Sequence, residues 1–147
     1  MKENAEGVEL LVAFGTDDGA HLNEDHVGMA KYFHVYSLNG TKEEFVEQRE
    51  NSKFKGDESM KHGDPQKARA TATALDKIDV IVGKRFGPNL LRLRKNLVCV
   101  VVRVKRIDEA LRIIQDHIEP ILEEYNKGED RKHLVLNTRE AVSIERD

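Results

Sequence analysis

Three short apolar runs rich in β-branched residues constrain the fold of this chain more than any other feature. They span residues 8–14, 79–83 and 97–102, and the first is followed by the turn Gly15-Thr16-Asp17-Asp18-Gly19. Short apolar runs bounded by turn residues are typical of strands that are covered on both faces of a sheet. A short helix that opens at Gly87-Pro88-Asn89 separates the second and third runs, so these two strands are predicted to form a parallel βαβ pair.

The remaining segments complete an α/β pattern. Residues 32–38 and 43–49 are predicted to form a hairpin around Asn39-Gly40. Asp64 and Pro65 are typical of a helix start, and that helix is expected to run to Asp76. The order is then three strands, helix, strand, helix, strand, helix, which predicts an α/β fold with a mixed five-stranded sheet.

The last helix and the tail are less regular. From Asp108 the apolar residues keep a helical period up to Gly128, and Pro120 is expected to kink or divide this helix. Residues 129–147 form a charged extension in which Leu134-Val135-Leu136 is one short apolar patch. The patch predicts either an added edge strand or a partly ordered segment, and the two alternatives remain open.

Composition narrows the classes of function. The chain has 147 residues, the size of one domain, and its net charge of −3 gives no global attraction for nucleic acid or anionic lipid. The basic stretch at residues 92–106 lacks interleaved aromatic residues and is predicted to be a solvated face. A polar N-terminus and the lack of a long apolar run predict a cytoplasmic protein. Cys99 is the single cysteine and is expected to be a buried hydrophobe, so one chain cannot hold a cluster with several thiolates.

Four ordered motifs resemble one known family. They are Thr16-Asp17-Asp18-Gly19, similar to its TDDG turn; residues 26–33, similar to H-F-G-R-A-x-x-F with Val27 and Met29 departing; His62-Gly63, similar to its HG loop; and residues 80–88, similar to V-V-I-x-G-G-[IM]-G-P with Lys84 and Arg85 departing. Over about Leu10 to Gly128 the chain thus resembles the dinitrogenase iron-molybdenum cofactor-binding (NifX-like) family. The resemblance implies a ribonuclease H-like three-layer fold and a role in nitrogen fixation. It also implies protein partners that donate and accept a metallocluster.

The resemblance directs attention to two histidines and one loop. His26 and His62 are candidate metal ligands, because neutral imidazole binds iron and molybdenum and because a helix start after His62 favours an anion. The loop from Gly83 to Gly87 is expected to lie beneath the cofactor, with Lys84 and Arg85 supplying local positive charge. For each of these residues an ordinary structural role is the alternative.

Residues 1–128 are therefore predicted to form a non-catalytic carrier domain for an iron-molybdenum or related iron-sulfur cofactor. One alternative is a metal-dependent nuclease or phosphodiesterase that uses Asp17 and Asp18, although turn formation is the more ordinary role of this pair. A structural zinc site at His21 and His26 is a weaker alternative, and a regulatory protein-binding module that has lost the cofactor is a third. The physiological ligand and the oligomeric state are left open.

Overall fold

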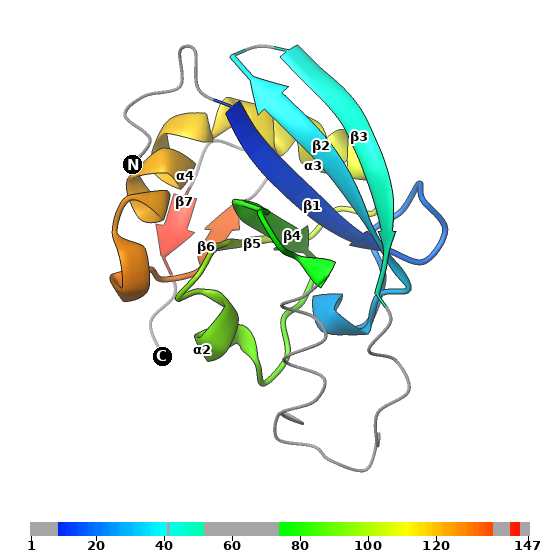
Figure 1. Ribbon diagram of the computed structural model, residues 1–147, viewed down its shortest axis with the longest axis horizontal. Coiled ribbons are helices and arrows are strands. Elements are labelled where there is room, and N and C mark those ends of the chain that lie inside the picture. The colour runs from blue at the N-terminus through cyan, green and yellow to red at the C-terminus, as the bar shows by residue number, and fades with distance from the viewer. Residues whose placement is uncertain (1–8, 41, 52–73, 137–141, 145–147) are drawn as a thin grey trace.

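The computed structural model describes residues 9–40, 42–51, 74–136 and 142–144 (Figure 1). Most of the predicted helix 64–76, together with His62, lies outside these residues. The strands are β1 (Glu9–Thr16), β2 (Tyr32–Asn39), β3 (Lys42–Glu50), β4 (Val80–Gly83), β5 (Val98–Val102), β6 (Leu134–Leu136) and β7 (Val142–Ile144). The helices are η1 (Val27–Met29), α2 (Leu90–Leu93), α3 (Ile107–Asp116), α4 (Ile118–Tyr125) and η3 (Gly128–Asp130).

The described strands form one mixed sheet in the order β3-β2-β1-β4-β5-β6-β7. β1, β4, β5 and β6 run parallel, while β2 is antiparallel to β1 and β3, and β7 is antiparallel to β6. The α/β class predicted from the sequence is confirmed. The prediction of five strands is wrong, because the described residues alone form a sheet of seven.

The two extra strands come from the tail. Leu134 and Leu136 are each 1% exposed, and Val101 of β5 pairs with Val135 in parallel register. β7 then pairs with β6, and Leu134 lies opposite Ile144. An apolar patch of three residues is too short to show a period in the sequence. Pairing with β5 therefore makes residues 134–136 a strand within the described sheet, with β7 on its outer side.

Alternate residues of the central strands are buried on opposite faces of the sheet. Val80 and Val82 of β4 join the core beneath α3 and α4, whereas Ile81 joins the second core together with Leu93 of α2. Figure 1 shows α3 and α4 on one side of the sheet and α2 at another side. Burial on both faces explains why these strands are continuous apolar runs without polar alternation.

The long C-terminal helix divides at His117, three residues before the expected point. α3 ends at Asp116 and α4 begins at Ile118, which places Pro120 in the first turn of α4. Proline is tolerated there because the first amides of a helix have no intrahelical acceptor. Among the residues that the structure describes, no helix is both long and apolar enough to cross a membrane.

Candidate functional site

The candidate residues gather where parallel strands end. β1 ends at Thr16 and its parallel neighbour β4 ends at Gly83. The loops that follow these strands lie next to each other, because the Val27 amide donates a hydrogen bond of 2.8 Å to the Arg85 carbonyl. We call this side of the sheet the carboxyl edge. Ligands of open α/β sheets bind at such an edge, in the crevice beyond the strand ends.

Val27 lies between the ends of β1 and β4. A Cβ atom added at Gly15 would come within 2.6 Å of Val27 Cγ2, and one added at Gly83 within 2.7 Å of Val27 Cβ. Real Cβ atoms do not approach so closely, so the valine occupies space that the two glycines leave open. The buried Val27 thereby fixes the loop that carries His26 onto both strands.

His26 lies against a third glycine. A Cβ atom at Gly87 would come within 2.7 Å of His26 Nδ1, so the imidazole lies directly over the Gly87 backbone. The His26 amide donates to Asp25 Oδ1 at 2.7 Å, and the buried Asn23 side chain donates to the His26 carbonyl at 2.9 Å. The position of the half-buried ring therefore depends on the lack of a side chain at residue 87.

The two predicted cationic residues differ in what they contact. Lys84 Nζ lies 2.6 Å from Glu24 Oε2, and its side chain is 15% exposed while that of Glu24 is 84% exposed. The hydrogen bond from Lys84 lowers the pKa of the Glu24 carboxyl. Arg85 is exposed, and no ion pair joins it to another described residue. Arg85 therefore offers more available positive charge than Lys84 does.

The Thr-Asp-Asp-Gly turn uses its carboxylates within the chain. Asp18 Oδ1 accepts hydrogen bonds from the amides of Ala20 and His21, each at 2.8 Å, and Oδ2 lies 2.7 Å from His21 Nδ1. These hydrogen bonds hold the pKa of the Asp18 carboxyl well below its usual range, and the bond from the Ala20 amide contributes most. Asp17 Oδ1 accepts from the Lys31 amide at 2.9 Å. The pair therefore shapes the turn and ties it to the start of β2, in line with the turn role.

Metal-binding groups are sparse in the described ranges. These ranges contain no group of three or more His, Cys, Asp or Glu side chains placed to hold a metal ion. Cys99 is 0% exposed, as its strand predicts, and burial raises the pKa of its thiol. His62 lies outside the described residues.

The structure brings together five of the predicted residues: His26, Gly83, Lys84, Arg85 and Gly87. Sequence reasoning assigned no part in the site to Val27 or Glu24. For Val27 the only signal in the sequence was its departure from the family motif. No signal in the sequence pointed to the ion pair between Glu24 and Lys84.

Comparison with known proteins identifies a family for this chain. Residues 8–127 match the family model described as dinitrogenase iron-molybdenum cofactor. The matched segment contains every residue of the carboxyl edge named above. A search of curated proteins gives no match. Because the family model covers most of the chain, the resemblance seen in the sequence is confirmed, and the protein belongs to the dinitrogenase iron-molybdenum cofactor family.

Proposed function

We propose that this protein is a non-catalytic carrier of an anionic iron-molybdenum-type or related iron-sulfur cofactor, which binds at the carboxyl edge. The observation that supports the proposal most directly is the contact of the His26 ring with Gly87, at the ends of two adjacent parallel strands. A ring held in place by its surroundings loses little freedom when it becomes a ligand. The family match points to the same class of cofactor.

Each residue of the site has a proposed role. His26 supplies an imidazole nitrogen to a metal of the cluster, and His62 supplies the second, from the segment after β3. The loop from Gly83 to Gly87 lies beneath the cluster with little side-chain bulk, and Arg85 supplies positive charge at its rim. The carrier receives its cargo from one protein and delivers it to another in the cytoplasm, as a NifX-like member of nitrogen fixation would.

A carrier of this kind requires no bond-making step. The order β3-β2-β1-β4-β5 of the first five strands supports a ribonuclease H-like arrangement, to which β6 and β7 are additions. A nuclease of that architecture needs carboxylates that are available to divalent metal ions. Asp17 and Asp18 instead accept hydrogen bonds from neighbouring groups, which favours the carrier over the nuclease.

The proposal is tested by anaerobic reconstitution with an iron-sulfur cluster, followed by visible absorption and metal analysis of the protein after gel filtration. We expect the wild-type protein to retain cluster, and the double variant His26→Ala, His62→Ala to lose most of it while its circular dichroism is unchanged. His133→Ala is the matched control, because His133 precedes β6 at the opposite edge of the sheet.

Three outcomes would each contradict a part of this proposal. Undiminished cluster in the double variant would remove the two histidines as ligands. Equal loss in the His133 control would mean that the effect is not local. Failure of the wild-type protein to retain any cluster would instead favour a regulatory module that has lost its cofactor.

A further inference from the structure

A concave site lies at the end of the parallel strands opposite to His26. A cavity of about 550 Å³ is lined by residues from two segments, 91–95 at α2 and 129–132 before β6. β5 begins at Val98 and β6 begins at Leu134, so the cavity lies at the amino ends of these parallel strands. We call it the basic pocket. Its volume is in the range of small-molecule binding sites.

The basic pocket is lined mainly by positively charged side chains, although the chain as a whole is negatively charged. Five basic side chains and two acidic ones line it, whereas the whole chain has a net charge of −3. The basic residues are Arg92, Arg94, Lys95, Arg131 and Lys132. Three of them belong to the stretch that sequence reasoning treated as a solvated face, and the other two come from a segment about 36 residues further along the chain. A local cluster of this kind attracts anions even on an acidic protein.

Arg131 holds the two walls of the basic pocket together. It is 7% exposed, its Nη1 donates a hydrogen bond of 2.9 Å to the Lys95 carbonyl, and its guanidinium carbon lies 5.1 Å from the centre of the Tyr125 ring. The buried Nε of the same guanidinium has no hydrogen-bond partner among the described residues. A buried cation with an unsatisfied donor is costly unless an anion compensates it.

The next residue is also fixed in place. The Lys132 amide donates to Glu124 Oε2 at 2.8 Å, and Glu124, which is 1% exposed, has its other oxygen 3.0 Å from Lys127 Nζ. The backbone that carries the Lys132 ammonium is therefore anchored before any ligand arrives. Prior anchoring lowers the entropy cost of binding.

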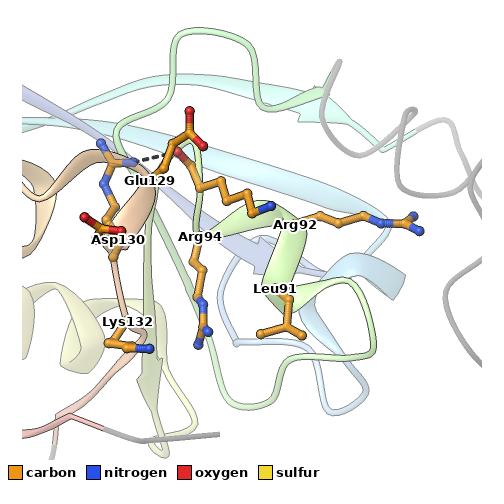
Figure 2. A pocket seen from close by; sticks show the side chains of 8 residues that line it. Leu91, Arg92, Arg94, Glu129, Asp130 and Lys132 are labelled. Carbon is orange, nitrogen blue, oxygen red and sulfur yellow. Dashed lines mark hydrogen bonds between the residues drawn. The ribbon is translucent and has the colours of Figure 1, made fainter.

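Figure 2 shows how the side chains lie around the pocket. Arg94 extends downward from one wall in this view and the Lys132 ammonium points toward its end from the other wall, whereas Glu129 points away from both. Leu91, which is 51% exposed, lies beside Arg94 and adds an apolar surface. An oxyanion between the two cationic head groups could accept hydrogen bonds from both, with the guanidinium providing a planar pair of donors.

We propose that the basic pocket binds a small oxyanion with two or more negative charges, principally through Arg94 and Lys132. None of the described lining residues is aromatic, so bases of a nucleic acid would find no side chain on which to stack. The proposal does not depend on the carrier role, because the pocket and the carboxyl edge lie at opposite ends of the parallel part of the sheet.

The test is calorimetric titration of the full chain with pyrophosphate at low ionic strength. We expect saturable binding at one site, weakened about tenfold or more in the double variant Arg94→Gln, Lys132→Gln, because two direct charge contacts are lost. The control Arg103→Gln, Arg112→Gln removes the same charge from exposed residues outside the pocket and should change affinity by no more than about twofold. If the double variant does not fold, Lys132→Gln alone is the test variant, because Lys132 is exposed and its substitution should not disturb the fold.

The outcomes decide the proposal. Equal weakening in the pocket variant and the control would mean that pyrophosphate responds only to net charge. Absence of saturation would show that the pocket takes no small oxyanion. Binding of a hexaglutamate peptide without binding of pyrophosphate would replace the small anion with an acidic protein segment.

Discussion

The carboxyl edge, after β1 and β4, and the basic pocket, before β5 and β6, lie at opposite ends of the parallel part of the sheet and are built in different ways. At the carboxyl edge, Gly15, Gly83 and Gly87 let Val27 and His26 lie against backbone, and the Lys84 charge is matched by Glu24. At the basic pocket, long cationic side chains surround an open cavity and acidic residues are the minority. The first site thus depends on close packing, and the second depends on charge.

This difference predicts how the two sites respond to change. A packed junction fails when an atom is added, because a buried β-branched side chain such as Val27 has few other rotamers and little space to move aside. A charged pocket tolerates changes of shape but responds to charge and salt. Substitutions at the carboxyl edge should therefore alter stability together with binding, whereas substitutions at the basic pocket should alter binding alone.

The largest effect is expected from Gly83→Ala. The new methyl group would meet Val27 Cβ at 2.7 Å and Val27 Cγ2 at 2.8 Å, between the end of β4 and the buried residue of η1. We expect urea denaturation to show a loss of about 1–3 kcal/mol in the free energy of unfolding, the usual cost of overpacking. Adding Val27→Gly to this variant should recover part of the loss caused by the methyl group. Strictly additive losses would show that Val27 does not fill the space beside Gly83.

The contact between Val27 and Gly83 is also a feature that could not be predicted from the sequence. The runs at residues 8–14, 79–83 and 97–102 predicted the central strands because burial on both faces leaves a local signature. The contact between Val27 and Gly83 joins residues that are far apart in the sequence and depends on β1 lying next to β4. Motif resemblance located His26 and the glycine loop, but nothing in the sequence indicated that Glu24 would pair with Lys84.

The basic pocket was missed, and the structure of the tail was left open, for a related reason. The sequence around residues 129–136 is mostly charged, and its single apolar patch has no period. Docking of β6 against β5 brings this segment close to α2 and places Arg131 against the Lys95 carbonyl. Basic residues that looked like a solvated face thereby become one wall of a cavity. Such a site arises from sheet topology, which composition does not encode.

A smaller effect, with a defined pH dependence, is expected from Asp18→Asn. Asparagine keeps an oxygen that can accept the amides of Ala20 and His21, so the substitution removes mainly the charge. Because folding lowers the pKa of Asp18, its ionised form stabilises the native state above the unfolded pKa, and this contribution is lost as pH falls toward the folded pKa. The variant should have a lower Tm than wild type at pH 7, with the gap narrowing below about pH 4. Asp76→Asn, at an exposed position, should show no such convergence, and a gap independent of pH would contradict the role of the Asp18 charge.

The smallest effect on stability is expected from Glu24→Gln. This substitution also tests most directly whether charge distinguishes the carboxyl edge from the basic pocket. Glu24 is mostly exposed, so losing its ion pair with Lys84 should change Tm little. The ammonium of Lys84 would then lack its matching carboxylate, and the carboxyl edge would come to resemble the basic pocket in charge. If an anionic cluster binds beside this loop, its affinity should rise about three- to tenfold in an anaerobic absorbance titration, as expected for one added charge near the ligand. Glu123→Gln on α4 is the charge-matched control and should give no such gain. An equal gain in both variants would assign the effect to net charge, and a gain in neither would place the cluster away from Lys84.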